Sequence, residues 1–204
     1  MDPSDIRAVG TRIPGMAASS TWADNVPSGA ASIALASAYW DATAFERAQE
    51  LAAHVGAART RMLLWTAGST KAGWRAARVA AVEDPALELR FVDSPTDAGI
   101  FHVKLAGIAD ATGAWLTGYV GSANWTKAAQ STNLELGVAL RGTELAALAD
   151  LRAWFDAEFA HATPATGIAW DRAIDIAADK SEAAERKQVF AAAALAVPAR
   201  AAAR

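Results

Sequence analysis

The chain has 204 residues, of which 53% are hydrophobic and 20% are charged, a composition typical of globular proteins rather than disordered or fibrous ones. Its formal net charge of −3 argues against a surface that is basic throughout, but this charge is compatible with a local basic groove. The absence of cysteine excludes disulfide scaffolds, cysteine–zinc sites and thiol catalysis. This length fits one domain with short arms.

The N-terminus does not resemble a secretion signal. It reads MDPSD, without the basic and apolar regions of a signal peptide. No run reaches the roughly 18 uninterrupted apolar residues of a membrane span. We therefore expect a cytoplasmic protein that does not associate with a membrane.

The first half of the chain predicts a layered α/β structure. Residues 1–30 contain three prolines and no sustained hydrophobic period, so we interpret them as an N-terminal arm. An apolar run, 32–40, precedes a predicted helix that begins at Thr43, with Glu46 in capping-box spacing, and ends near Gly56. The next predicted elements are a strand, a helix and a strand at 61–66, 71–82 and 87–92. Alternation of strands and helices indicates a sheet flanked by helices.

A hairpin and a further strand and helix follow. Strands at 100–108 and 115–120 are joined by the turn sequence DATG, in which Asp opens the turn and Gly closes it. A strand at 134–140 and an amphipathic helix at 143–160 complete a domain of residues 31–162. Residues 163–204 are predicted to be an Ala-rich C-terminal tail with two helices, 168–178 and 181–197.

Residues suited to phosphate chemistry lie on and beside the hairpin. His102 and Lys104 are two residues apart on a predicted strand, so they face the same side. The second strand runs into the sequence GSAN, where small residues admit a ligand to the backbone and Ser122 and Asn124 supply polar groups. Glu135 stands in an otherwise apolar strand and needs a partner, for which a histidine is suitable.

Together these residues predict a phosphodiester site that works without metal or cofactor. Lys104 and Asn124 can neutralise phosphate oxygens as charge gathers in the transition state. The imidazole of His102 can attack phosphorus to form a phosphohistidine, while Glu135 holds the ring and stabilises the imidazolium. No cluster of acidic residues for magnesium accompanies these positions in the sequence.

The combination of HxK at 102–104, GSxN at 121–124 and Glu135 in NLELGVAL resembles the HKD motif of the phospholipase D superfamily, in particular its small single-motif nucleases and restriction-endonuclease catalytic domains. The resemblance implies a layered αβα fold with a mixed β-sheet. It implies that Lys104 and Asn124 bind the phosphate and that His102 is the nucleophile. It also implies that two motifs meet in one site, so one motif per chain requires a homodimer or higher homo-oligomer.

Two positions leave more than one interpretation open. The family motif has an aspartate seven residues after the histidine, whereas this chain has Ala109 there and Asp110 one residue later. Strand alternation turns Asp110 to the other face unless a bulge intervenes, so it has either the family role or a turn-opening role. Ser122 similarly either contacts phosphate or shapes the turn.

The function implied by the resemblance is a DNA endonuclease, with DNA favoured over RNA. A missing recognition domain indicates low specificity or a partner protein, such as an ATPase or recognition subunit of a bacterial defence or restriction system. One alternative is a phospholipase D-type lipid hydrolase, which the absence of a basic amphipathic helix disfavours. Another is a catalytically weakened scaffold that binds nucleic acid or a partner.

Overall fold

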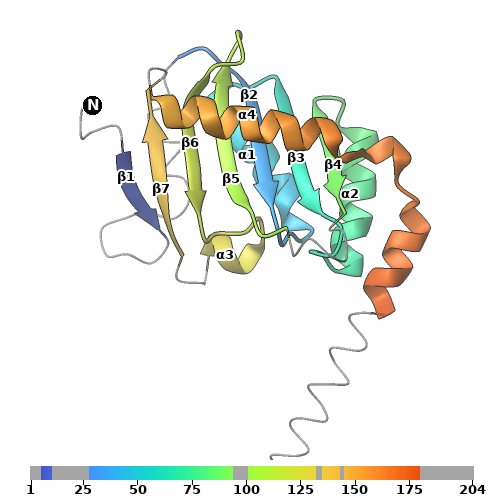
Figure 1. The fold of residues 1–204 in the computed structure, drawn as a ribbon. Helices are drawn as coiled ribbons and strands as arrows, with labels where there is room; N and C mark the ends of the chain where they lie inside the picture. The colour runs from blue at the N-terminus through green and yellow to red at the C-terminus, as the bar shows by residue number, and fades with distance from the viewer. Residues whose placement is uncertain (1–5, 11–27, 94–100, 132–134, 143–144, 180–204) are drawn as a thin grey trace, which may run out of the picture.

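The computed structural model describes residues 6–10, 28–93, 101–131, 135–142 and 145–179. Its strands are β1 (Ile6–Gly10), β2 (Ala30–Ser37), β3 (Arg59–Trp65), β4 (Leu87–Val92), β5 (Lys104–Asp110), β6 (Trp115–Gly121), β7 (Leu136–Arg141) and β8 (Thr163–Pro164). They form one mixed sheet in the order β1-β7-β6-β5-β2-β3-β4-β8 (Figure 1). β2, β3 and β4 are parallel, whereas the β5–β6–β7 neighbours are antiparallel.

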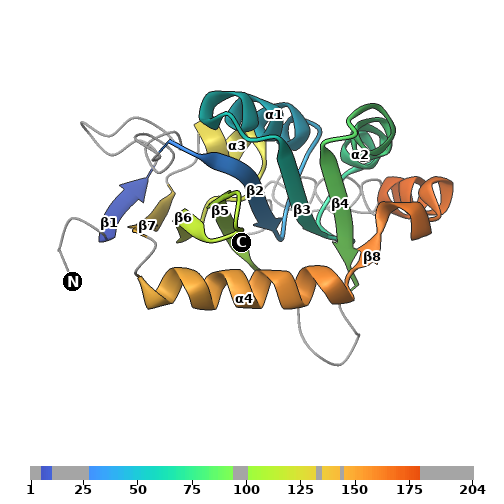
Figure 2. The same cartoon turned by 90° about the horizontal axis from the view of Figure 1, so that it is seen from above.

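Helices cover both faces of the sheet, as the layered α/β prediction requires. The helices α1 (Thr43–Val55), α2 (Lys71–Glu83) and α3 (Lys127–Ser131) lie on one side, and α4 (Ala146–His161) crosses the other (Figure 2). Residues 170–179 form a further helix beside α2. Among the described helices, none combines the length and apolar character needed to cross a membrane.

The central strands are buried on both faces, which explains their nearly continuous apolar sequences. Alternate side chains of a strand point to opposite faces. In β2, Ile33 and Leu35 therefore join the core beneath α1 and α2, while Ala34 and Ala36 pack on the α4 side. Small alanines on one face and larger residues on the other let α4 approach the sheet closely.

An aromatic cluster joins the C-terminal helix to this core. Trp74 of α2 stacks on Phe91 of β4, with ring centroids 4.9 Å apart. Trp170 meets Trp74 and Phe91 edge-on at 6.0 and 5.8 Å. Each such pair adds about 0.5–1.5 kcal/mol beyond area burial. The helix at 170–179 is therefore part of the folded domain.

The domain extends beyond the predicted boundaries at both ends. β1 pairs with β7, so part of the predicted arm, 1–30, belongs to the sheet. β8 pairs with β4, and Ile174 and Ala177 are buried in the core, so the structure does not end the domain at 162. Sequence analysis missed the two strands because short edge strands carry little periodicity, whereas the helix at 170–179 agrees with the predicted helix at 168–178. The predicted helix at 181–197 lies outside the described residues.

Local boundaries also differ from prediction where polar residues end an element. β5 begins at Lys104, so His102 precedes the strand, and β7 begins at Leu136, so Glu135 also precedes its strand. The capping box at Thr43 is wrong: Ala42 occupies the N-cap without a side-chain hydrogen bond. Instead, the Asp41 carboxylate accepts hydrogen bonds from the Thr43 amide and hydroxyl at 2.9 and 2.7 Å.

We predict that Ile174→Ala lowers the free energy of unfolding by about 2–4 kcal/mol, because it opens a cavity in the core beneath helix 170–179. Asp175→Ala, at the exposed neighbouring position, changes it by about 0.5 kcal/mol or less. Chemical denaturation of both variants measures the difference. Equal effects would contradict the assignment of this helix to the domain.

Candidate functional site

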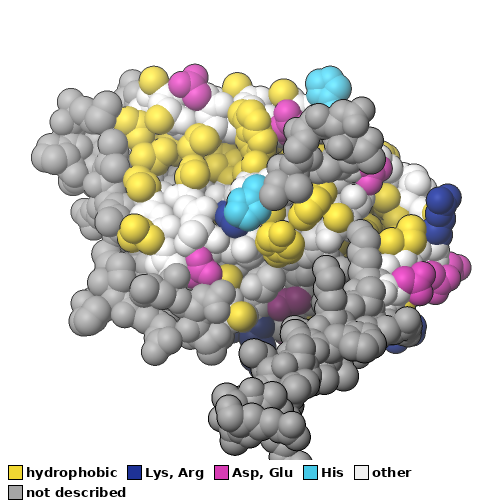
Figure 3. Space-filling view, turned by 60° about the horizontal axis from the view of Figure 1, so that its bottom comes forward, with side chains coloured by type: hydrophobic (Ala, Val, Ile, Leu, Met, Phe, Trp, Pro, Cys, Tyr) yellow, Lys and Arg dark blue, Asp and Glu magenta, His cyan; other side chains and the backbone are white. Residues whose placement is uncertain are grey.

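The strand topology gathers the motif residues at one edge of the sheet. β2 and β5 are antiparallel neighbours, and their register pairs Ser37 with Lys104. β6 and β7 pair Gly121 with Gly137, so the segments containing Ser122 and Glu135 leave the sheet side by side. Figure 3 brings this edge forward and shows a histidine with a basic side chain behind it and hydrophobic side chains to one side.

His102 and Lys104 contact each other directly. Lys104 Nζ lies 2.8 Å from His102 Nε2 and 3.3 Å from the His102 carbonyl oxygen. An ammonium group has only donors, so Nε2 accepts and a neutral imidazole carries its proton on Nδ1. The predicted shared orientation of the two side chains is therefore present, although His102 lies just before the strand.

Lys104 is a buried cation beside a buried carboxylate. Its side chain belongs to a residue that is 6% exposed, and Glu135 is 8% exposed. Burial lowers the pKa of Lys104 because it removes water from the ammonium group, and the charge of Glu135 acts in the opposite direction. The charge of Glu135 therefore favours the protonated form of Lys104 against the effect of burial.

Ser122 holds Glu135 in position. The Ser122 hydroxyl donates a hydrogen bond to Glu135 Oε2 and accepts one from the Leu136 amide at 3.0 Å. The Ser122 amide donates to the Leu136 carbonyl at 2.9 Å. Of the two interpretations of Ser122, these contacts support the structural one: its hydroxyl fixes a carboxylate and the adjoining strand.

Asn124 is tied to the end of β2. Its side-chain oxygen accepts a hydrogen bond from the Tyr39 amide at 3.1 Å, which orients its NH₂ group as a donor. Close by, the Ser37 hydroxyl accepts from the Trp125 amide at 3.0 Å and donates to the Tyr39 carbonyl at 2.6 Å. Trp125 is buried in the core, so its side chain packs within the protein and is not exposed for stacking on a base.

Two glycines let Tyr119 lie beneath this site. A Cβ atom on Gly121 would come within 2.2 Å of the Tyr119 hydroxyl, and one on Gly137 within 2.3 Å of its ring. The hydroxyl of Tyr119 accepts from the Ala123 amide at 3.4 Å. Burial raises the pKa of Tyr119, and the charge of Glu135 adds to that rise.

Asp110 lies at the opposite end of β5, away from Lys104. Its Oδ1 accepts hydrogen bonds from the Thr112 amide and hydroxyl at 2.8 and 2.7 Å and from the Ala114 amide at 3.0 Å. These bonds lower the pKa of Asp110. The structure thus gives Asp110 the turn-opening role and does not bring it to the other motif residues. A register shift after Ile108 accompanies the turn.

Direct contacts therefore join His102 with Lys104 and Ser122 with Glu135, the charge of Glu135 acts on Lys104, and Tyr39 links Asn124 to His102. Sequence reasoning missed Tyr39, whose ring meets His102 edge-on at 6.0 Å, because it stands in a run that reads as a buried strand. It also missed Ser37, although a fully buried serine in an apolar strand is a signal of polar anchoring.

Of the basic residues, Arg78 pairs with Asp171 on the surface at 3.0 Å. The described residues contain no group of three or more potential metal ligands.

Comparison with protein families identifies the superfamily. A family model for the phospholipase D-like domain of cardiolipin synthase matches residues 32–159. The chain belongs to the phospholipase D superfamily. This assignment confirms the resemblance drawn from the HKD-type motif, and the matched region contains His102, Lys104, Asn124 and Glu135.

Solved structures support the same fold. Nuc, a phospholipase D family member from Salmonella typhimurium, aligns with a TM-score of 0.55 and 18% identity over 78% of this chain and 96% of its own. NucT from Helicobacter pylori aligns with a TM-score of 0.56 and 15% identity over 78% of this chain and 98% of its own. Phosphatidylserine synthase from Haemophilus influenzae Rd KW20 aligns with a TM-score of 0.52 and 11% identity over 90% of this chain and 47% of its own. Comparison with curated proteins gave no significant match.

We predict that Lys104→Gln loses most of the affinity for inorganic phosphate, because a buried ammonium group is replaced by a neutral amide. In the wild type this affinity falls as the pH rises through the Lys104 pKa, and burial moves the fall to a lower pH than for an exposed lysine. Isothermal titration at several pH values measures both effects.

Asp110→Ala is the matched control for this prediction. It removes hairpin hydrogen bonds and lowers the melting temperature, but it keeps the phosphate affinity of the wild type. Loss of phosphate binding in Asp110→Ala, at a temperature where the variant is folded, would contradict the turn-opening role and show that Asp110 contributes to the site.

Proposed function

We propose that the protein is a metal-independent phosphodiesterase, specifically a DNA endonuclease that acts through a covalent phosphohistidine. The contact between His102 Nε2 and the buried Lys104 ammonium carries this proposal. It combines a nucleophile and a fixed cation at the open edge of the sheet. Phosphodiester hydrolysis needs both, because negative charge gathers on the phosphoryl oxygens while the nucleophile attacks.

The first step exchanges one partner of Lys104 for another. A phosphate oxygen takes over the ammonium donor that Nε2 accepts in the unliganded site, which frees the imidazole lone pair. Nε2 attacks phosphorus, a P–N bond forms, and the P–O bond to the leaving oxygen breaks. Asn124 donates to a phosphoryl oxygen from its NH₂ group. Glu135 stabilises the positive charge that develops on the Lys104–His102 pair.

Both steps require another imidazole, since the oxygen that leaves in the first step needs a proton and the water of the second step must be activated. We assign this role to the His102 of a second copy of the chain across a two-fold axis. That imidazolium gives its proton to the leaving oxygen and, once neutral, takes one from the attacking water. The P–N bond then breaks and His102 is restored.

An apolar surface beside His102 fits a second copy. Val120 and Val138 are partners in the β6–β7 register and are each 40% exposed, and Leu136 is 61% exposed. His102 and Val120 line a common hollow with Leu151 and Trp154 of α4. Contiguous exposed apolar residues mark an interaction site more strongly than scattered ones do.

We predict that the wild type cleaves plasmid DNA in the presence of EDTA, whereas His102→Ala loses about 10³-fold or more of this activity because the nucleophile is missing. Gel analysis measures cleavage, and mass spectrometry detects the phosphoryl adduct on His102. His54→Ala, at an exposed position on α1, is the matched control and keeps full activity.

Other results would direct the function elsewhere. Release of a headgroup from phosphatidyl lipids with no cleavage of DNA would support the lipid hydrolase. Binding of DNA without cleavage or adduct would support the scaffold that binds nucleic acid or a partner. Cleavage by His102→Ala at the wild-type rate would exclude the histidine mechanism. A nuclease subunit of a defence or restriction system would cleave DNA without strong sequence preference when it acts alone, and an ATPase or recognition partner would supply any specificity.

We predict a composite site from subunit mixing. If each active site uses two histidines, an equal mixture of wild-type and His102→Ala chains, refolded together, has about a quarter of the wild-type activity, since mixed dimers are inactive. Independent monomers would have about half. Val138→Glu places a charge in the apolar surface and shifts the protein to monomers in light scattering. Val82→Glu, at an 80% exposed valine on α2, leaves the assembly unchanged.

A further inference from the structure

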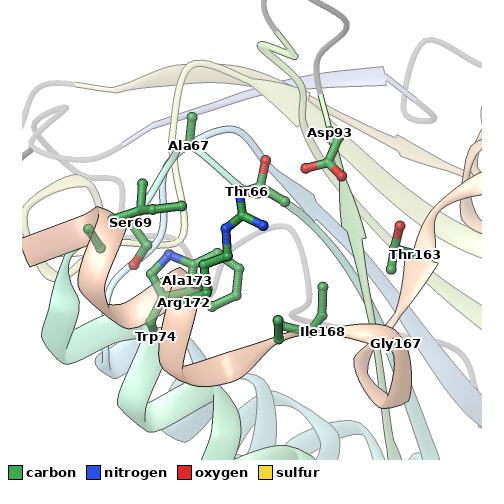
Figure 4. Close-up of a pocket in the computed structure, with 13 residues that line it drawn as sticks. Thr66, Ala67, Ser69, Trp74, Asp93, Thr163, Gly167, Ile168, Arg172 and Ala173 are labelled. Carbon is green, nitrogen blue, oxygen red and sulfur yellow. The ribbon is translucent and has the colours of Figure 1, made fainter.

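A second pocket opens on the same edge of the sheet. It has a volume of about 530 Å³ and lies at the carboxyl ends of β3 and β4, between α2 and helix 170–179 (Figure 4). Apolar residues form much of its wall, including Trp74, Ile168 and Ile176. Its polar lining residues are Thr66, Ser69, Asp93, Thr163 and Arg172. A volume of this size is typical of small-molecule sites.

Two opposite charges face this pocket without neutralising each other. Arg172 projects into the hollow towards Thr66, and Asp93 lies across from it in Figure 4. Both residues are exposed, and within the described part of the chain neither makes a hydrogen bond or ion pair. By contrast, the hydroxyls of Thr66 and Ser69 donate to the Val92 and Trp40 carbonyls. The guanidinium and the carboxylate are therefore the groups available to a ligand.

Aromatic residues connect the pocket with the motif site. Tyr39 is 42% exposed and meets His102 edge-on at 6.0 Å. Tyr39 also meets Trp65 edge-on at 5.8 Å, and Trp65 is the last residue of β3, directly before Thr66 in the pocket wall. Three strand spacings separate β5 from β4, or about 15 Å along the edge. A chain of a few nucleotides spans this distance.

We propose that this pocket binds an unpaired nucleobase and its phosphate, a few nucleotides from the scissile phosphate, and that single-stranded nucleic acid is therefore cleaved in preference to a duplex. The proposal rests on the phosphodiesterase function above. Arg172 pairs with the phosphate. Asp93 accepts from an exocyclic amino group, as carboxylates do from cytosine. The face of the base lies on Ile168 and Ile176, and Tyr39 stacks on a base nearer His102.

The lining favours a base over an acyl chain. Two charged groups in the pocket wall would lose water without compensation against a hydrocarbon chain, which is costly. A nucleobase offers hydrogen-bonding groups at its rim and an apolar face, which matches a polar rim around an apolar wall. A paired base in a duplex cannot turn its edge and face into the pocket, so the duplex is excluded from this subsite.

The test compares single-stranded oligonucleotides of increasing length with bis(p-nitrophenyl) phosphate, which is too short to reach the pocket. In the wild type, kcat/KM rises about tenfold or more once the strand reaches the pocket, which is the scale of one bound base. Arg172→Gln and Ile176→Asp both reduce the ratio of kcat/KM for long over short substrates towards one. Arg47→Gln, which removes an exposed arginine from α1, keeps the wild-type ratio.

The outcomes separate this inference from the proposed function. Cleavage of bis(p-nitrophenyl) phosphate with no dependence on strand length, or equal cleavage of duplex and single strand, would overturn the pocket assignment and leave the phosphodiesterase intact. Selective loss of phosphatidyl lipid cleavage in Arg172→Gln would assign the pocket to lipid and also overturn it. If the wild type cleaves nothing, the proposed function fails, but fluorescence anisotropy of a labelled single strand still tests the pocket. Weaker binding of the strand by Arg172→Gln than by Arg47→Gln supports the pocket assignment. Equal binding by the two variants overturns it.

Discussion

A buried ammonium group at the end of a strand is the constraint on which the site depends. Lys104 loses most of its water, and a charge in that position needs compensation from its neighbours. The lone pair of His102 Nε2 and the charge of Glu135 provide it. In the proposed function the same arrangement receives the phosphate, because an anionic oxygen compensates the ammonium group better than a neutral imidazole does. In the proposed mechanism the exchange of partners also releases the nucleophile.

The sheet supplies this arrangement through where its strands end. His102, Ser122 and Glu135 all lie just outside β5, β6 and β7, where their side chains are not committed to one face of the sheet. The loop at the end of β2 fixes Asn124 through the hydrogen bond from the Tyr39 amide, while Ser37 holds the adjoining Trp125. Glycines at the β6–β7 pair give Tyr119 room below them. Rigid strands therefore place short polar segments with little freedom to move apart.

The surroundings of His102 divide between two proposed uses. On the α4 side lie the exposed apolar residues of β6 and β7, which suit a second copy of the chain. Towards β3 and β4 lie Tyr39 and the pocket of Arg172 and Asp93, which suit a substrate strand. The two surfaces extend from the histidine in different directions, so a dimer partner and a substrate can occupy the edge together.

The sequence by itself determined the layered α/β class, most of the central strands and helices, and the motif HxK, GSxN and Glu that assigns the superfamily. Hydrophobic periodicity and residue chemistry are local properties, so they can be recognised from the order of residues alone. Only the tertiary structure decided that Asp110 belongs to a turn, that Ser122 holds Glu135, and that Tyr39 borders His102. It also joined β1, β8 and helix 170–179 to the domain. These facts depend on register and on contacts between distant segments, which the order of residues in one strand or helix does not contain.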